Sequence, residues 1–252
     1  MAHSGRRLAY NRPIENPWFS NPLPRDMNIN ELPETERARF NMVEQQVRPW
    51  NVHDERVLRA LFDVPRERFV PPQLQALAFS DLELPLVIDG VDTREYMLSP
   101  KVEAKLAQEL LLEPGDCVLE IGTGSGYQAA LLSRLAQQVT SIELESRLSA
   151  FAQTNLQRNH IHNVKLEIGD AHAGWGTAEF DAILITGSVP SVPDALKYQL
   201  AIGGRLVAVV GRAPVMTACR ITRTSAAGFE TVGLFDTLIK PLRGTAKSRF
   251  KF

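Results

Sequence analysis

The sequence has few of the features that define specialised protein classes. It has 2 cysteines, Cys117 and Cys219, without a Cys-x-x-Cys pair or a Cys/His cluster, so neither a disulfide scaffold nor a zinc site is indicated. No apolar run approaches the ~18–20 residues that a membrane-spanning helix needs. Arg6 and Arg7 precede no apolar segment that would make a secretory signal. We therefore expect a cytoplasmic protein without a membrane partner.

Charge of one sign is also lacking, because the formal net charge is -1. This balance argues against a protein that binds nucleic acid through bulk charge. With 252 residues and 44% hydrophobic content, the chain can build one sizeable α/β core. Residues 1–33 differ in composition, since they are rich in proline, asparagine and arginine. We expect them to form a mostly mobile N-terminal arm, and residues 34–252 to form a single domain.

One stretch of the chain carries the clearest signal for a ligand. Residues 118–128 read as a buried strand, a tight loop and the start of a helix, with glycines at alternating positions 122, 124 and 126. Glycine permits backbone conformations that a Cβ forbids, and the new helix presents unpaired N–H groups beside the loop. The stretch therefore predicts a cradle for a nucleotide-type ligand, although a glycine turn that only packs a helix on a sheet is the simpler alternative.

The spacing of these glycines indicates which ligand the cradle holds. A dinucleotide fingerprint is matched only weakly, from Gly124 through Gly126 to Ala129, and a phosphate-binding lysine is absent from the loop. The pattern acid-x-Gly-x-Gly-x-Gly, beginning at Glu120, is instead typical of the first motif of S-adenosylmethionine-dependent methyltransferases.

Polar side chains follow the next three predicted strands as well. Glu143 ends the segment 139–143, Asp170 follows 164–168, and Thr186 follows 180–185. In open α/β sheets, ligands bind in the crevice beyond the carboxyl ends of the strands. We expect these side chains to lie at one sheet edge together with the glycine loop. There Glu143 can bind ribose hydroxyls, and Asp170 can accept from an adenine amino group.

The remaining pattern predicts the fold class. Helical periodicity over 38–47, 57–62 and from Pro100 onward surrounds the strands, and 217–224 and 229–242 alternate in the antiparallel manner. We predict an α/β, Rossmann-like class I methyltransferase with a mixed, mostly parallel sheet, helices on both faces and antiparallel C-terminal strands. Residues 34–99 are expected to form a helical cap and acceptor loop over the pocket, and residues 100–244 the core. Residues 245–252 are expected to form a basic tail. The basic residues near this end, Arg243, Lys247, Arg249 and Lys251, are expected to be solvated.

Residues 41–244 resemble the protein-L-isoaspartate O-methyltransferases. The strongest match is VLEIGTGSGYQAA at 118–130, and further matches include Asn163-Val164, Gly169-Asp170 and the Gly203-Gly204 turn. The resemblance implies S-adenosyl-L-methionine as methyl donor and, as acceptor, a protein or peptide bearing isoaspartyl residues. The cofactor-binding residues it implies are Glu120, Gly122, Thr123, Gly124, Ser125, Gly126, Glu143, Leu144, Asp170, Ala171 and Thr186.

The chain departs from the family pattern where the acceptor binds. The family carries Thr-Ile-Ser-Gln-Pro, whose hydroxyls hold the substrate carboxylate, and the same positions here are Tyr96-Met97-Leu98-Ser99-Pro100. Leu98 therefore stands at the family's serine. Ser99 is the expected replacement, with Thr93 and Tyr96 as further candidates, although Ser99 can equally be a helix N-cap. Near the end, Ile239-Lys240-Pro241-Leu242 replaces the family's Phe-Val-Pro-Leu.

The chemistry needs no strong general base, because a carboxylate acceptor is already ionised at neutral pH. The missing Ser-His-Asp or Cys-His set is thus no objection to an enzyme. Three functions stay open from the sequence: an isoaspartyl methyltransferase with a rebuilt acceptor loop, a relative that methylates another protein or a small molecule, and a non-catalytic scaffold that binds the donor. The oligomeric state is not predicted.

Overall fold

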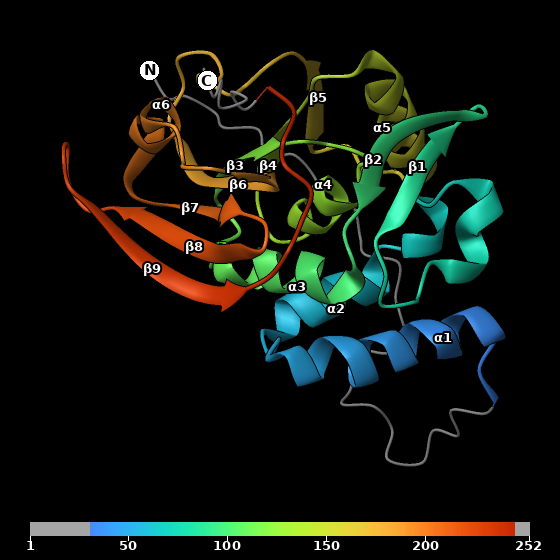
Figure 1. The fold of residues 1–252 in the computed structure, drawn as a ribbon. Coiled ribbons are helices and arrows are strands. Elements are labelled where there is room, and N and C mark those ends of the chain that lie inside the picture. Colours follow the sequence, from blue (N-terminus) through green and yellow to red (C-terminus); the bar gives the residue numbers. More distant parts are fainter. Residues whose placement is uncertain (1–30, 245–252) are drawn as a thin grey trace, which may run out of the picture.

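The computed structural model describes residues 31–244, so most of the predicted N-terminal arm and the tail at 245–252 lie outside the described residues. The domain is built on a seven-stranded sheet with the strand order β5-β4-β3-β6-β7-β8-β9 (Figure 1). Strands β3 to β7 are parallel, while β8 and β9 continue the sheet antiparallel, as the sequence predicted. The strand bounds are β3 Cys117–Ile121, β4 Gln138–Glu143, β5 Val164–Ile168, β6 Phe180–Val189, β7 Leu200–Arg212, β8 Val215–Arg223 and β9 Phe229–Asp236.

The order of the strands places a crevice beside β3. The chain enters the sheet at β3, moves outward through β4 and β5, and then returns to pair β6 with the other side of β3. Connections from neighbouring strands therefore leave in opposite directions at this point. Such a switch point opens a gap at the carboxyl ends of the strands, where α/β proteins bind their ligands.

Alternating side chains bury both faces of the sheet. Val118 and Leu184 belong to one hydrophobic cluster, and their chain neighbours Leu119 and Ile183 belong to the other. This is the period of two that strands impose. The first cluster includes side chains of five helices, and the second includes Leu196 of a sixth. The helices are α1 Glu34–Met42, α2 Glu55–Asp63, α3 Pro100–Glu109, α4 Tyr127–Leu132, α5 Ser146–Arg158 and α6 Asp194–Tyr198.

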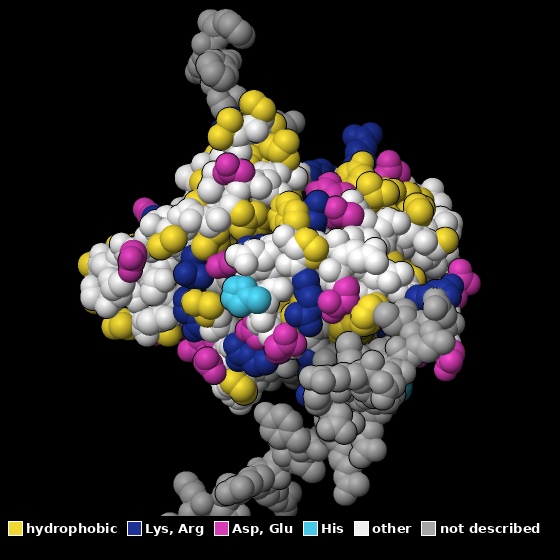
Figure 2. Space-filling model, turned by 90° about the horizontal axis from the view of Figure 1, so that it is seen from below, with side chains coloured by type: hydrophobic (Ala, Val, Ile, Leu, Met, Phe, Trp, Pro, Cys, Tyr) yellow, Lys and Arg dark blue, Asp and Glu magenta, His cyan; other side chains and the backbone are white. Residues whose placement is uncertain are grey.

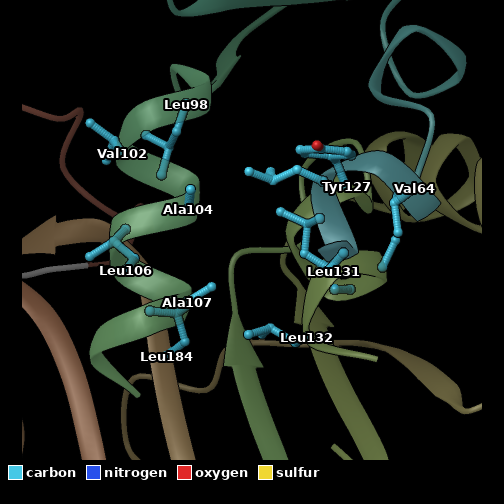
Figure 3. Packing of buried hydrophobic residues seen from close by; sticks show 14 of the residues in the cluster. Val64, Leu98, Val102, Ala104, Leu106, Ala107, Tyr127, Leu131, Leu132 and Leu184 are labelled. Carbon is cyan, nitrogen blue, oxygen red and sulfur yellow. The ribbon is translucent and has the colours of Figure 1, made fainter. Parts of the chain in front are cut away.

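Helix α3 packs beside the helix that follows the glycine loop. Figure 3 shows Leu98 and Ala104 on the side of α3 that faces Tyr127 and Leu131 of α4, with Leu184 of the sheet below them. All five side chains are at most 9% exposed. Close packing at this seam fixes α4, and thus the glycine loop, relative to the chain just before α3.

The N-terminal part departs in detail from the predicted helices. Helix α1 continues as the π-helical turn Val43–Val47 and the 3-10 turn Arg48–Trp50, and the chain reverses at Asn51, whose φ of 59° is left-handed. Helix α2 begins after its N-cap residue Asp54, whose side chain accepts from the Arg56 backbone N–H at 2.8 Å. Short 3-10 turns follow at Arg66–Arg68 and Pro72–Leu77.

A β-hairpin occupies much of the region predicted as a helical cap. Strands β1 Leu84–Ile88 and β2 Val91–Met97 pair antiparallel and turn at Asp89 and Gly90, both with positive φ. Only two residues of β2, Thr93 and Met97, are buried. Because β2 has so little apolar alternation, its pairing with β1 was not predicted.

The chain after β9 crosses the sheet edge instead of continuing the sheet. Strand β9 ends at Asp236 rather than at 242, and residues 237–244 form what we call the C-terminal strap. It is bound to β6 by hydrogen bonds from the Ser188 N–H to the Lys240 carbonyl and from the Leu242 N–H to the Ser188 carbonyl, both 2.9 Å. In Figure 1 the strap runs upward between the sheet and the β1–β2 hairpin.

Both cysteines are free and half-buried, and no helix within residues 31–244 is long and apolar enough to cross a membrane. In the same described part of the chain, His, Cys, Asp and Glu form no group that could hold a metal ion. The face seen in Figure 2 carries basic and acidic side chains interspersed rather than gathered by sign.

Candidate functional site

A cavity opens at the carboxyl ends of β3, β4 and β6, where the topology places the crevice. Its floor includes Gly122 and Gly124 of the loop after β3. Side chains that follow β4 and β5 line a second wall, and the β1–β2 hairpin and the C-terminal strap complete it. Seven of the predicted cofactor-binding residues line this cavity, namely Gly122, Gly124, Glu143, Leu144, Asp170, Ala171 and Thr186.

The glycine loop lies in direct contact with β6. The Thr186 hydroxyl donates to the carbonyls of Ile121 and Gly122, at 2.9 and 2.6 Å. Gly122 has a φ of +99°, and a Cβ at this position would lie 2.4 Å from Thr186 Oγ1. Only glycine therefore fits here, and its open backbone leaves the cavity floor accessible to a ligand.

Glu143 joins the end of β4 to the loop. One carboxylate oxygen accepts from the Gly124 N–H at 2.8 Å, and the other from the Glu145 N–H at 3.1 Å. Burial raises the pKa of Glu143, while these backbone hydrogen bonds oppose the rise. An acceptor fixed in this way at a strand end is suited to bind hydroxyl groups of a ligand.

The wall after β5 combines apolar contact with a carboxylate. Asp170 Oδ1 accepts from the His172 N–H at 2.9 Å, which fixes the carboxylate at the cavity. Ala171 lies next to it, and Leu144 and Leu148 line the same cavity. A flat heteroaromatic ring with an exocyclic amino group fits this set, because the aliphatic side chains pack on the ring and the carboxylate accepts from the amino group.

Glu120 supports the loop from behind and does not line the cavity. It is fully buried, and its Oε2 accepts from the Ser141 hydroxyl, which is also hydrogen-bonded to Thr123 Oγ1. Its Oε1 has no hydrogen-bond partner among the described residues. Burial, together with the charges of Glu143 and Glu103, raises the pKa of Glu120 to about 8, while the Ser141 hydrogen bond opposes the rise.

The two remaining predicted loop residues position helices rather than the cavity wall. Gly126, with φ +82°, is the N-cap residue of α4, and a Cβ there would lie 3.1 Å from Ala152 Cβ. The Ser125 carbonyl accepts from Asn155 Nδ2 at 3.0 Å. Both contacts join the loop to α5, so we place Ser125 and Gly126 in the support of the cradle.

Of the three predicted acceptor-binding residues, the structure brings only Tyr96 to the cavity. The Thr93 hydroxyl donates to the Leu86 carbonyl at 2.7 Å and accepts from the Glu95 N–H at 3.1 Å, so it holds the hairpin together. Ser99 is the N-cap residue of α3 but makes no side-chain cap hydrogen bond, and it is buried. Leu98 lines the cavity in the place that the sequence comparison indicated.

Several cavity residues were missed because the C-terminal strap was predicted as sheet and tail. Arg243 pairs with Glu145 at 2.7 Å and also binds Glu95 and the Thr93 carbonyl. The prediction of a solvated tail is therefore wrong for Arg243, while Lys247, Arg249 and Lys251 lie outside the described residues. Lys240 lies 2.8 Å from Glu95. These ion pairs join segments about 100 residues or more apart, so local sequence contained no signal for them.

Acidic side chains dominate the charge of the cavity. Glu83, Glu95, Glu143 and Asp170 line it, against Lys240 and Arg243. Burial also raises the pKa of Glu83. A wall of this composition favours a cationic ligand, so the residues present fit the sulfonium of S-adenosylmethionine as well as its ribose and adenine.

Two solved structures share this fold over most of the chain. A protein-L-isoaspartate O-methyltransferase matches with a TM-score of 0.68 at 25% identity, covering 82% of this chain and 65% of its own. A Plasmodium falciparum protein, described as a protein-L-isoaspartate O-methyltransferase in complex with S-adenosyl-L-homocysteine, matches in fold with a TM-score of 0.70 at 18% identity, covering 84% and 99%. Fold and cavity together define a Rossmann-like, S-adenosylmethionine-dependent methyltransferase.

Sequence relatives narrow this class to one family. The model of the protein-L-isoaspartate(D-aspartate) O-methyltransferase family matches residues 37–238. A Rhodopseudomonas palustris protein-L-isoaspartate O-methyltransferase is 40% identical over 205 residues, covering 81% of this chain and 92% of the relative. The Methylorubrum extorquens enzyme is 41% identical over 201 residues, covering 79% and 86%. The chain belongs to the protein-L-isoaspartate(D-aspartate) O-methyltransferase family, which confirms the predicted resemblance.

Proposed function

We propose that this enzyme transfers a methyl group from S-adenosylmethionine to the free carboxylate of isoaspartyl residues in damaged proteins or peptides. The observation that supports this most strongly is the shared cavity. Its donor side has the glycine loop with Glu143 and Asp170, and its other side has Tyr96 and Lys240, which can contact an acceptor. Family membership gives the reaction class, and the cavity gives the residues that would perform it.

Each wall of the cavity would bind one part of the donor. We assign the ribose hydroxyls to Glu143, the adenine to Asp170 and Ala171, and the amino-acid portion to the open backbone of Gly122 and Gly124. Thr186, Glu120 and Thr123 would keep the loop in place. When bound, S-adenosylmethionine supplies an electrophilic methyl group on a positively charged sulfur.

The protein's task in the transfer is to hold and enclose the acceptor. A carboxylate is ionised at neutral pH, so no side chain needs to remove a proton. Positioning one carboxylate oxygen and excluding water can each contribute several kcal/mol to the lowering of the barrier. The hairpin and the strap meet at the cavity through Lys240 and Arg243. Tyr96 is the predicted acceptor-binding side chain that this arrangement favours over Ser99 and Thr93.

A methyl-transfer assay tests this proposal directly. The purified enzyme is incubated with radiolabelled donor and either an isoaspartyl peptide or the same peptide with a normal aspartate. We expect base-labile methyl esters on the first peptide only. Ser99→Ala is expected to retain activity, while Tyr96→Phe is expected to raise the KM for the peptide. Calorimetric retention of the donor without any ester formation would contradict the proposal.

Where the enzyme acts is a further part of the proposal. We place it in the cytoplasm, in support of which both cysteines are free, as is usual in a reducing compartment. Fractionation of cells with an antibody against the chain tests this placement. The absence of a nucleic-acid partner stays a prediction. The ultraviolet absorbance spectrum of the purified protein tests it, because co-purified nucleic acid would add its own absorbance band.

A further inference from the structure

The acceptor side of the cavity contains few groups that can donate a hydrogen bond to a carboxylate. Among the described residues that line the cavity, the side chains able to donate are those of Tyr96, Thr186, Lys240 and Arg243. Leu98, at the position where the family carries a serine, contributes no donor. One of these four side chains is therefore expected to hold the acceptor in place of the missing hydroxyl.

Two of the four side chains are already committed to other contacts. The Thr186 hydroxyl donates to the carbonyls of Ile121 and Gly122, and a hydroxyl has only one proton to give. Arg243 binds both Glu95 and Glu145 as well as a backbone carbonyl of β2. These contacts join the strap to the hairpin and to the residues after β4, so Arg243 has a structural role.

Lys240 keeps a donor available. An ammonium has three N–H donors, and its described partners are two, the Glu95 carboxylate at 2.8 Å and the Arg94 carbonyl. The Lys240 backbone is fixed, because its carbonyl accepts from the Ser188 N–H at 2.9 Å. Its side chain is 36% exposed. The cation is therefore anchored at the cavity and still accessible to an incoming ligand.

Charge also favours Lys240 over Tyr96 as the principal group. An acceptor carboxylate approaches a wall that holds Glu83, Glu95, Glu143 and Asp170, and like charges oppose its entry. A neutral phenol does nothing against this repulsion, whereas an ammonium offsets it and forms a charge-assisted hydrogen bond.

Lys240 also lies where a second cavity begins. An adjoining groove is lined by Pro190, Met216 and Leu238, and it shares Tyr96 and Lys240 with the donor cavity. A peptide in this mostly apolar groove would pass the ammonium before its carboxylate reached the donor. The junction of the two cavities is thus the place for a group that selects a charged acceptor.

From these contacts we infer that Lys240 is the specificity-determining residue that binds the acceptor carboxylate, in place of the hydroxyl replaced by Leu98. The inference rests on the proposed function, because it assigns a role within that same acceptor site. Tyr96 contributes a second hydrogen bond at the same junction. Glu95 holds the ammonium in place when no acceptor is bound.

Binding measurements test this role without requiring turnover. The enzyme is saturated with S-adenosylhomocysteine and titrated by calorimetry with an isoaspartyl peptide and with its neutral isoasparaginyl analogue. We expect the wild-type enzyme to prefer the carboxylate. Lys240→Met is expected to reduce this preference about tenfold, the order expected for one charge-assisted hydrogen bond, with the Kd for S-adenosylhomocysteine changed less than about twofold. Lys240→Arg, which keeps the charge, is expected to retain most of the preference.

Two further variants separate carboxylate binding from a structural tie. Glu95→Gln frees the ammonium, and we expect it to keep or increase the preference for the carboxylate. If Lys240 only joined the strap to the hairpin, Lys240→Met would weaken the binding of the isoaspartyl peptide, its isoasparaginyl analogue and S-adenosylhomocysteine alike, and the inference would be overturned. Lys197→Met serves as the control, because Lys197 pairs with Asp194 at 2.6 Å on α6 and does not line the cavity.

The proposed function and this inference fail in different ways. If the wild-type enzyme methylates the isoaspartyl peptide but folded Lys240→Met keeps the full carboxylate preference, only the role of Lys240 is overturned. If the wild-type enzyme retains the donor and methylates no isoaspartyl peptide, the proposed function is overturned, and the inference that rests on it with it.

Discussion

The Thr186 hydroxyl donates a hydrogen bond of 2.6 Å to the Gly122 carbonyl, so the cavity floor is joined to β6 at a position where no Cβ fits. We expect Gly122→Ala to weaken donor binding by at least about tenfold, the factor that ~1.4 kcal/mol represents. The new methyl group would meet Thr186 Oγ1, and alanine is strained at a φ of +99°. Calorimetric titration with S-adenosylhomocysteine measures the effect.

Two glycines of the same chain provide matched controls for this prediction. A Cβ on Gly115 has nothing within 4 Å and no unusual φ, and one on Gly176 has nothing within 4 Å but a φ of +60°. Gly115→Ala is expected to leave donor binding unchanged, and Gly176→Ala to affect stability alone. If Gly122→Ala binds the donor as tightly as Gly115→Ala does, the loop is not the donor cradle.

Removing the Glu143 carboxylate tests the strand-end assignment. We expect Glu143→Ala to raise the donor Kd about 10- to 100-fold, since hydrogen bonds to charged groups contribute about 1.5–3 kcal/mol. Glu143→Gln can still accept from the Gly124 N–H and should lose less. Glu167→Gln is the control. Glu167 lies near the carboxyl end of the neighbouring strand β5 but binds Trp175 and Lys165 and does not line the cavity. Equal Kd values for all variants would contradict the ribose assignment.

The sequence was sufficient to predict the sheet and the donor wall because their signals are local. Strands that are buried on both faces appear in the sequence as apolar runs. A polar residue stands at or just after the end of each run, so Glu120, Glu143, Asp170 and Thr186 could be identified from the sequence alone. Parallel pairing then had to bring these positions to one edge. Glu120 nevertheless points behind the loop, because a period of two places it on the face of Val118.

The acceptor side could not be predicted because long-range contacts define it. Strand β2 is polar and mostly exposed, and only its pairing with β1 and its ion pairs to the strap reveal its place. Lys240 lies in the segment 229–242 that was predicted to extend the sheet, and only the Ser188 hydrogen bonds place its backbone across the sheet edge. Ser99 lies one residue from Leu98, yet α3 begins there and buries it.

Titration of Glu120 predicts a pH dependence of stability. The pKa of Glu120 is about 8 in the folded protein against 4.5 for an ordinary glutamate carboxyl, so between these values the folded state binds the proton and the unfolded state does not. Its contribution to stability is therefore fully present below 4.5 and is lost as the pH rises through about 8, at up to about 1.4 kcal/mol per pH unit.

Glu120→Gln isolates this contribution, because glutamine keeps the shape and cannot titrate. Urea unfolding of both proteins at several pH values from about 5 to about 9 gives the difference in their unfolding free energies. We expect the unfolding free energy of the variant to increase relative to that of the wild-type enzyme as the pH rises. Glu103 and Glu143 are present in both proteins, so their titration cancels in the difference. A difference that does not vary with pH would show that Glu120 is ionised in the folded state.

Arg66 joins the segment before α3 to the interior by four contacts. Its guanidinium is fully buried, pairs with Glu103 and donates to the carbonyls of Leu98 and Ala78 at 2.7 and 2.8 Å. It also lies 4.9 Å from the Tyr127 ring centroid. We expect Arg66→Met to destabilise the fold by about 3–5 kcal/mol, because it leaves the Glu103 carboxyl buried without its partner.

A double-mutant cycle with Glu103→Leu separates the ion pair from the packing. Burial raises the pKa of Glu103 to about 7 even beside Arg66, whose charge opposes the rise, so Glu103 is costly to bury alone. If the pair explains the loss, the variant carrying both substitutions is more stable than Arg66→Met by roughly 1–3 kcal/mol in urea unfolding. It should still show a raised KM for the isoaspartyl peptide, since the Leu98 carbonyl has lost its donor. Additive losses in the cycle would instead mean that Arg66 stabilises the fold through Tyr127 and the backbone carbonyls alone.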